Sequence, residues 1–202
     1  MTWHCKTSGA YSRTSQEAID NAAEIYSVLY KQGWTVNAVA GLLGNIGYES
    51  GYNPWRWQND NIGASDGSPW KNKGYGLVQF TPASKYINSA MSTPGYGPNF
   101  SDQPGRITDG NSQMIYLDGY ADYYPTKAYP MTYAEYKKST NDAGTLAVTW
   151  LYNYERPADP ASTEAARREA GLYWFDVLGG ITPSKNTALY LLYLWEVTNN
   201  VR

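Results

Sequence analysis

Hydrophobic residues recur at helical spacing in a segment near the start of the chain. The apolar positions lie three or four residues apart: Ala18, Ala22, Ile25 and Leu29. They follow a polar run at 14–17, Thr-Ser-Gln-Glu, which has the pattern of a capping box, and Gly33 supplies a stop. The pattern predicts an amphipathic helix over this segment.

A second helix is predicted from Thr35, a capping residue, to Glu49, just before Gly51 and Pro54. Its apolar stripe consists of Val39, Leu43 and Ile46, and its glycines recur every third residue at 41, 44 and 47. An interior glycine costs a helix about 1 kcal/mol relative to alanine. We therefore expect another helix or a ligand to approach this backbone closely.

The helical period is lost between Trp55 and Phe80, where Gly, Asn, Asp, Ser and Trp dominate. This composition predicts loops, in which a small β-hairpin can form. Helix is expected to restart at Thr81-Pro82 and to recur near 111–123, 132–139, 142–153 and 160–178, with a long surface loop at 92–110. For the last helix we expect Asp159 as its cap and a buried face made by Ala166, Ala170, Tyr173 and Val177.

These elements predict a mainly α (α+β) fold, a helical domain with a small β or loop lobe and a cleft between them. The expected organisation is an N-terminal arm at 1–13, a catalytic domain at 14–178, and a linker with a C-terminal segment of unassigned role at 179–202.

Composition narrows the possible partners. The formal net charge is −2, so no overall positive field favours nucleic acid or an anionic membrane. The densest apolar run, 188–195, is far shorter than the roughly twenty residues of a membrane span. We also expect no secretory signal peptide, because the first residues lack an apolar core.

The chain has one histidine, His4, and one cysteine, Cys5. An internal disulfide is impossible, and a zinc site would lack its usual ligands. Adjacent side chains tend to point apart, so His4 and Cys5 are a poor nucleophile and base. We expect no metal or cofactor, which leaves carboxylate chemistry for a hydrolase.

Aromatic residues make up 15% of the chain and include twenty Tyr and eight Trp but three Phe. Tyr and Trp combine an apolar face with a polar edge and so suit amphipathic ligands such as sugars, although the same rings serve equally well in a core.

Glu49 is the candidate general acid. Glycoside hydrolysis needs a carboxylic acid that still holds its proton at the working pH. At the C-terminal end of an apolar helix, partial negative charge and lost solvation would both raise the pKa of such a group. An ordinary exposed glutamate at a helix end is the competing interpretation.

Three motifs together resemble the lysozyme-like superfamily. They are Gly-Tyr-Glu-Ser-Gly at 47–51, Gly-Tyr-Gly-Leu-Val-Gln-Phe at 74–80, and Tyr-Asn-Tyr-Glu-Arg-Pro at 152–157. The second is similar to the Gly-Leu-Met-Gln segment of goose-type lysozymes and lytic transglycosylases, and the third to their Tyr-Asn motif. Residues 39–57 with the two later motifs most closely resemble the phage tail lysozyme family, and the resemblance spans roughly 14–178.

This resemblance implies that Glu49 is the general acid, that Gln79 and the backbone around Tyr75 and Gly76 line the cleft, and that Tyr152 or Asn153 closes it opposite. Amide and hydroxyl groups can hydrogen-bond an N-acetyl sugar. The tryptophans of the polar segment are candidate stacking platforms beside the cleft: Trp55, Trp57 and Trp70.

A second carboxylate is expected in the polar segment, where Asp60 and Asp66 could activate water across from Glu49. Asp60 is preferred, because Asp66-Gly67 is also a common turn dipeptide. A lytic transglycosylase would need only one glutamate. Glu155 lies in a charge-dense stretch and is interpreted as an anchor between helices through ion pairs.

The favoured function is therefore a muramidase that hydrolyses the β-1,4 bond between N-acetylmuramic acid and N-acetylglucosamine of peptidoglycan. The resemblance implies a phage tail lysin that acts at the bacterial wall during entry, with virion tail proteins as possible neighbours. The alternatives are a lytic transglycosylase of the same fold, a released endolysin and a non-catalytic glycan-binding tail module.

Overall fold

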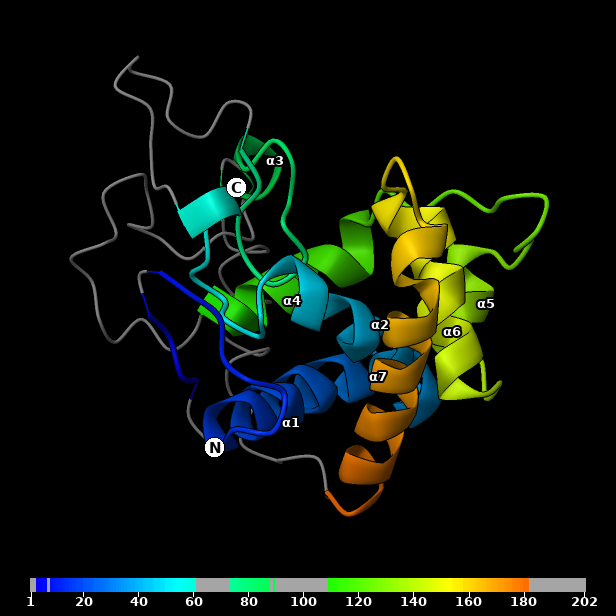
Figure 1. The fold of residues 1–202 in the computed structure, drawn as a ribbon, viewed down its shortest axis with the longest axis horizontal. Coiled ribbons are helices and arrows are strands. Elements are labelled where there is room, and N and C mark those ends of the chain that lie inside the picture. The colour runs from blue at the N-terminus through cyan, green and yellow to red at the C-terminus, as the bar shows by residue number, and fades with distance from the viewer. Residues whose placement is uncertain (1–2, 7, 61–72, 88, 90–108, 182–202) are drawn as a thin grey trace, which may run out of the picture.

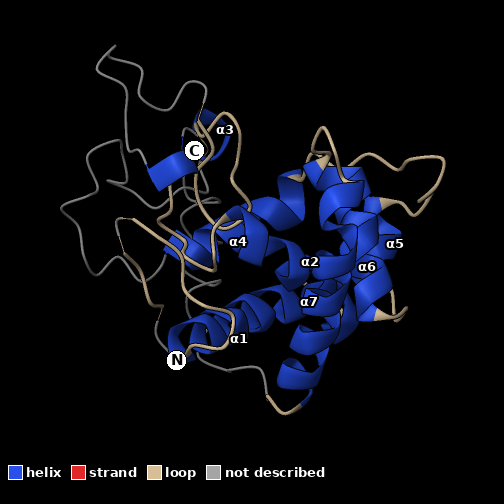
Figure 2. Ribbon diagram, viewed as in Figure 1, coloured by secondary structure: helices blue, strands red, loops and turns tan. Residues whose placement is uncertain are grey.

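The protein is an assembly of α-helices joined by loops (Figures 1 and 2). Its computed structural model describes residues 3–6, 8–60, 73–87, 89 and 109–181. Along the chain the helical elements are α1 (Gln16–Lys31), α2 (Val36–Glu49), η1 (Gln58–Asp60), α3 (Ser84–Ile87), α4 (Asp109–Tyr120), α5 (Tyr133–Lys138), α6 (Ala143–Trp150), η3 (Leu151–Glu155) and α7 (Ala161–Gly179). The predicted mainly helical fold is confirmed.

Helix α2 is the central element. It packs against α6 and α7 along most of its length and also contacts α1, which in turn packs against α4 (Figure 1). Its apolar side chains Val39, Leu43 and Ile46 are fully buried. Because α2 is enclosed in this way, the residue at its end is held in a fixed place.

Side-chain caps start several helices where the sequence predicts them. Thr35 accepts a hydrogen bond from the Ala38 amide at the start of α2, and Thr132 forms a full capping box with Glu135 at the start of α5. At α1 the cap is Ser15, one residue later than the start of the predicted box. Each cap satisfies an amide that the helix itself leaves unpaired.

Other boundaries differ from the expectation. Helix α4 begins at Asp109 and ends at Tyr120, earlier than the predicted 111–123, and the helix expected from Thr81-Pro82 is only the short α3. Helix α7 is preceded by Pro160 without a side-chain cap, so Asp159 does not cap it. The last part of the predicted 142–153 helix is a separate π-helical turn, η3.

The buried face of α7 also differs from the predicted stripe. Its buried residues are Arg167, Ala170, Gly171, Trp174 and Leu178, whereas Ala166 is exposed and Tyr173 and Val177 are partly buried. The face is rotated by about one residue because α7 packs through its small residues against α2. This rotation brings a charged side chain into the interior.

The glycines of α2 allow the close contact that their spacing predicts. A Cβ at Gly44 would lie 2.8 Å from the Arg167 carbonyl oxygen and 2.9 Å from the Gly171 nitrogen. Both atoms belong to the backbone of α7, which cannot give way as a side chain can. The element that approaches α2 at Gly44 is therefore a helix.

The polar segment forms loops. Within the part of it that the structure describes, isolated bridges join Tyr75 to Trp57 and to Phe80, and no strand is formed. The predicted small β lobe is thus not confirmed. Residues 61–72 lie outside the described part, as do most of the predicted 92–110 loop and the segment 182–202.

The N-terminal arm is bound to the helical body through two buried asparagines. Asn21 of α1 accepts a hydrogen bond from the His4 amide and donates to the His4 carbonyl, and the Asn53 side chain donates to the carbonyls of Lys6 and Gly9. The arm therefore packs against α1 and the loop that follows α2. No helix among the described residues is long and apolar enough to cross a membrane.

Candidate active site

Glu49 is the last residue of α2 and forms an ion pair with Arg167 of α7. Its Oε1 lies 3.0 Å from Arg167 Nη2, and the two side chains are 21% and 6% exposed. The helix end places partial negative charge near Glu49, and the guanidinium places positive charge beside it. Glu49 is therefore accessible to solvent on one side and fixed by a buried cation on the other.

Arg167 is itself held by the helices around it. Its Nη1 donates to Asn45 Oδ1 at 2.7 Å, and the Asn45 amide donates to the carbonyls of Gly41 and Ala147. The Tyr48 ring lies over the guanidinium, 4.7 Å from its centroid. Residues of α2, α6 and α7 thus fix the orientation of the Glu49 carboxylate.

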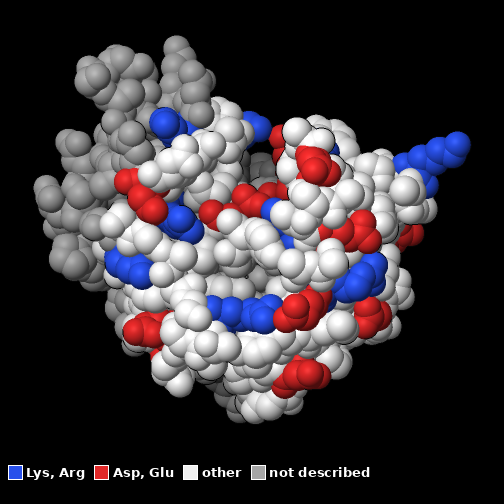
Figure 3. Space-filling view, viewed as in Figure 1, with Lys and Arg blue, Asp and Glu red and all other residues white. Residues whose placement is uncertain are grey.

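Glu49 borders a cavity of about 780 Å³, which we call the Glu49 cavity. It is lined by Tyr48, Glu49, Arg56, Trp57, Gln58, Asn59, Val78, Gln79, Phe80, Thr81, Lys85, Tyr116, Tyr120, Ala121, Asp122, Tyr154, Glu155 and Arg156. The space-filling view shows a hollow near the top of the molecule, with acidic side chains along its floor (Figure 3). The volume is in the range of small-molecule binding sites.

Glu155 borders the same cavity and was missed as a site residue. It ends η3 and its Oε1 accepts a hydrogen bond of 2.9 Å from the indole N–H of Trp150. Burial raises the pKa of Glu155 well above its usual value, the negative charge of Glu49 adds to the increase, and Arg167 opposes it. The third motif thus contributes a carboxyl group to the cavity, whereas the sequence suggested only an anchoring role.

Gln79 is one of three residues of the second motif that line the Glu49 cavity, with Val78 and Phe80. Its Nε2 donates to the carbonyls of Arg56 and Gly76, both at 3.0 Å. Its Oε1 accepts no hydrogen bond from the residues that the structure describes. The amide is therefore fixed at one end and offers an acceptor at the other.

The neighbouring residues of that motif lie deeper than expected. Tyr75 is fully buried, and Gly76, at φ +82°, packs against the amide of Gln113, so that neither borders the cavity. The stretch from Val78 to Thr81 lines it instead. The expected contact of Tyr75 and Gly76 with substrate is corrected accordingly.

The expected tryptophan platforms are part of the core. Trp55 and Trp57 are 3% and 1% exposed, and Trp57 packs against Tyr75 with ring centroids 4.8 Å apart. A ring covered by protein cannot offer its face to a sugar. Trp55 does not border the Glu49 cavity, and Trp57 borders it with almost no exposed surface, so neither offers the stacking face that the sequence predicts. Trp70 lies outside the described residues.

Exposed tyrosines occupy the walls instead. Tyr120 of α4 is 62% exposed and stacks on Tyr116, and Tyr48, 46% exposed, stands on the guanidinium of Arg167. Tyr116 in turn meets Phe80 edge to face. The spacing of four residues between Tyr116 and Tyr120 on a helix was the available sequence signal for this wall.

Asp60 does not border the Glu49 cavity. It accepts a hydrogen bond of 2.7 Å from the Gly9 amide and pairs with Arg56 at 3.2 Å, and these contacts lower its pKa, the Gly9 bond most. Such contacts give Asp60 a structural role between the arm and the polar loop. Asp66 lies outside the described residues.

The Tyr-Asn pair of the third motif does not line the cavity either. Asn153 is fully buried, where it donates to the carbonyl of Tyr129 and accepts from the amide of Thr126. Tyr152 donates its hydroxyl to Glu164. The motif does contribute to the wall of the cavity, but through the three residues that follow, at 154–156.

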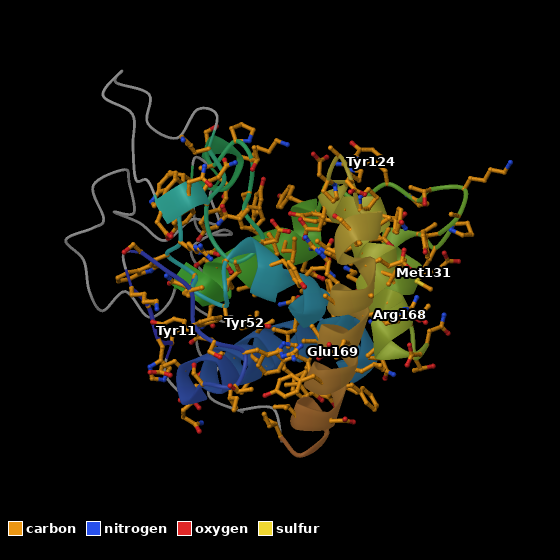
Figure 4. The ribbon with its side chains drawn as sticks, in the orientation of Figure 1. Tyr11, Tyr52, Tyr124, Met131, Arg168 and Glu169 are labelled. Atoms are coloured by element: carbon orange, nitrogen blue, oxygen red, sulfur yellow. The ribbon has the colours of Figure 1, made fainter. Side chains whose placement is uncertain are left out.

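A third carboxylate of the cavity, Asp122, is already paired. Lys85 lies 3.0 Å from its Oδ2 and lowers its pKa, and the Tyr124 hydroxyl donates to its Oδ1. Arg156 lies over the ring of Tyr124, whose position at the top of the molecule is marked in Figure 4. Basic and acidic groups thus alternate along this rim.

No cluster of histidine, cysteine or carboxylate side chains suited to a metal ion occurs among the described residues. His4 pairs with Asp20 at 2.8 Å, on the side of α1. The cavity presents carboxyl groups, side-chain amides, basic side chains and aromatic hydroxyls.

Comparison with known proteins agrees with this arrangement. The sequence model described as phage tail lysozyme matches residues 20–178. Morphogenesis protein 1 of Bacillus phage B103 is 39% identical over 168 residues, which are 82% of this chain and 41% of that protein. The chain thus spans less than half the length of this relative.

The family match implies peptidoglycan-lytic activity of the glycosidase type in a phage setting. The matched region includes Glu49, Gln79 and Glu155, which meet at the cavity. Since the match covers most of the sequence, this chain belongs to the phage tail lysozyme family.

Proposed function

We propose that the chain is a muramidase in which Glu49 is the general acid. The bond cleaved is the β-1,4 linkage between N-acetylmuramic acid and N-acetylglucosamine. Glu49 donates its proton to the glycosidic oxygen as the bond breaks, and a water molecule attacks the anomeric carbon. The observation that carries the proposal is the fixed, partly exposed carboxyl of Glu49 on a cavity with the Gln79 amide and exposed tyrosines on its walls.

Substrate contacts follow from the groups on these walls. The free Oε1 of Gln79 suits the N–H of an acetamido group, and the faces of Tyr120 and Tyr48 suit the apolar face of a sugar ring. Both tyrosines are supported from behind, by Tyr116 and Arg167, which limits the entropy lost when a ligand binds.

The first test is the substitution Glu49→Gln. The amide keeps the shape of the side chain and an oxygen for Arg167 but has no proton to transfer, so we expect activity to fall by about 10² to 10⁴-fold. The release of reducing ends from purified peptidoglycan measures activity, and circular dichroism checks the fold. Glu169→Gln, the same change at an exposed position of α7 (labelled in Figure 4), should retain full activity. More than a tenth of wild-type activity in Glu49→Gln would exclude Glu49 as the acid.

A lytic transglycosylase in the same fold is the second candidate, because Asp60 is engaged by Gly9 and Arg56. That reaction closes an anhydro ring on the sugar and needs no water-activating carboxylate near Glu49. Mass spectrometry of the digestion products separates the two reactions, since hydrolysis leaves reducing ends and transglycosylation leaves anhydro ends. Free peptides with intact glycan strands would contradict both.

We further propose that the enzyme acts at the wall as part of a phage tail during entry. The family supports this role, and the net charge of −2 suits an enzyme tethered at an anionic wall better than a freely diffusing one. Immunogold labelling of intact virions would show tail particles decorated near the tip. Labelling found only in the lysate would support a released endolysin instead.

A further inference from the structure

Basic side chains on the wall of the candidate active site differ in whether they are paired. Among the described residues, Arg56, Lys85 and Arg156 line this cavity. Arg56 pairs with Asp60 at 3.2 Å, and Lys85 pairs with Asp122 at 3.0 Å. Arg156 is exposed and forms no ion pair with any carboxylate that the structure describes. Its positive charge is therefore left for a ligand in the cavity.

The acidic groups near Arg156 are held by other donors. Asp122 accepts from Lys85 at Oδ2 and from the Tyr124 hydroxyl at Oδ1. Glu155, which precedes Arg156 in the chain, accepts at Oε1 from the N–H of a buried indole. Neither carboxylate lies within ion-pair distance of the Arg156 guanidinium, so neither takes the place that a ligand would occupy.

The guanidinium of Arg156 is held in position by uncharged contacts. The backbone is left-handed at φ +47°, and the Arg156 amide donates to the Leu151 carbonyl at 2.9 Å. Nη2 donates to the Asp122 carbonyl at 3.2 Å, and the guanidinium lies 4.7 Å from the centroid of the Tyr124 ring, which Figure 4 labels. A guanidinium carries several N–H donors, and most of these remain unused here. A group held in this way suits a carboxylate, which it can bind through two parallel hydrogen bonds.

The rest of the cavity is unfavourable to an anion. Glu49, Glu155 and Asp122 all line it, and acidic side chains are visible along its floor in Figure 3. A carboxylate on a bound glycan is repelled by these groups and attracted by the unpaired guanidinium of Arg156. The charge distribution therefore directs an acidic substituent towards Arg156.

We propose that Arg156 binds a carboxylate on the substituent that distinguishes N-acetylmuramic acid from N-acetylglucosamine. That substituent is a lactyl ether, which either ends in a free carboxylate or continues into a stem peptide with carboxylates of its own. Chitin has a similar glycan backbone without this group. Arg156 thus makes the site selective for muramyl glycans over chitin. The inference rests on the proposed function, because it requires a glycan in the Glu49 cavity.

Isothermal titration calorimetry of the Glu49→Gln protein tests this selectivity without turnover. The ligands are muramyl oligosaccharides with stem peptides, the same oligosaccharides freed of peptide, and chitin oligomers of equal length. We expect at least one muramyl ligand to bind more tightly than chitin. Adding Arg156→Gln should weaken its binding relative to chitin by about threefold to tenfold, as expected for an exposed charged pair. An effect on both muramyl ligands identifies the lactyl position, and an effect on the peptide-bearing ligand alone identifies the stem peptide.

Two further variants keep the test decisive. Arg156→Gly removes the side chain at a backbone conformation that glycine adopts freely, so it should also reduce the selectivity, even if glutamine disturbs the turn. Arg168→Gln removes an exposed arginine of α7 outside the cavity lining and should leave the selectivity unchanged. Circular dichroism checks the fold of each variant.

The possible failures are distinguishable. Equal binding of chitin and both muramyl ligands overturns the proposal, as does an unchanged selectivity in Arg156→Gln and Arg156→Gly. Equal weakening of all three ligands would also overturn it, because Arg156 would then not recognise the carboxylate. If none of the three ligands binds to the Glu49→Gln protein, the proposed function fails, and this inference fails with it.

Discussion

At the scale of single residues, Arg167 determines the surroundings of Glu49. It is a cation at 6% exposure, and a buried cation is tolerated only with good partners, which here are Glu49 and Asn45. The sequence predicts Glu49 from its motif and its helix end. It does not predict Arg167, because a charged residue beside Ala166 and Arg168 gives no sign that it is the one facing inward.

The exposure of the aromatic residues is likewise not predicted by the sequence. Tryptophans near Glu49 in sequence suggested sugar platforms. Trp55 and Trp57 are instead buried, although Trp57 borders the cavity, and an exposed ring on the wall is that of Tyr120, seventy-one positions after Glu49. The composition shows only that Tyr and Trp are abundant. The burial of each ring depends on packing between segments that are distant along the chain. A single sequence does not give this packing.

The substitution Tyr120→Ala tests whether the exposed ring on the cavity wall binds substrate. Loss of a stacking face should raise KM by about threefold to tenfold, in line with roughly 0.5–1.5 kcal/mol for such a contact, and leave kcat nearly unchanged. Tyr120→Phe should keep the wild-type KM, since the ring face remains. Tyr30→Ala removes a tyrosine of similar exposure from α1, outside the cavity lining, and serves as the control. An equal KM for Tyr120→Ala and the wild type would remove Tyr120 from substrate binding.

At the scale of elements, the central contact is that between α2 and α7. The glycine spacing predicts a close approach, and the structure confirms it at Gly44, where the backbone of α7 lies against the helix. Caps such as Thr35 and Thr132 likewise follow from local sequence. The π-turn η3 does not, because the sequence pattern predicts one continuous helix over 142–153 and such turns are rare.

Gly44→Ala tests this contact. The added methyl would meet two backbone atoms of α7 within 3 Å, so α7 must shift, and we expect a loss of about 1–3 kcal/mol in the free energy of unfolding. Urea unfolding followed by circular dichroism measures it. Gly119→Ala in α4 is the matched control, because a Cβ there meets nothing within 4 Å and alanine favours helix by up to about 1 kcal/mol. Equal stability of Gly44→Ala and the wild type would mean that the helices are not in close contact.

At the scale of the whole molecule, the helical architecture could be predicted because helical periodicity is a local signal. The cavity could be predicted only in part: Glu49 and Gln79 come from motifs, whereas Glu155, Tyr48 and Tyr120 reach it through the mutual packing of α2, α4 and η3. Asp60 was chosen for its place in a polar loop. Its actual partners, Gly9 and Arg56, include a residue from the far N-terminal arm.

The contacts of Asp60 with Gly9 and Arg56 predict that the free energy of unfolding depends on pH. Its pKa is lowered in the folded state, so its contribution is complete above the pKa of a free aspartate and is lost as the pH falls. The stability difference between the wild type and Asp60→Asn should therefore shrink as the pH drops below about 3.8, the unperturbed value. Urea titrations at a series of pH values measure this difference. Asp176→Asn, at an exposed position of α7 with no hydrogen bond or ion pair among the described residues, should show no such trend. A constant difference for Asp60→Asn would contradict the structural role.

The hydrogen bond from the Gly9 amide to Asp60 also allows motion beside the Glu49 cavity to be measured at the N-terminal arm. The arm contributes the donor, and the acceptor belongs to η1, whose Gln58 and Asn59 line the Glu49 cavity. Solvent exchange of that one amide hydrogen therefore reports how often the arm and the loop beside the cavity separate. Separation of the arm from this wall of the cavity can thus be followed at Gly9, with no label or ligand in the cavity itself.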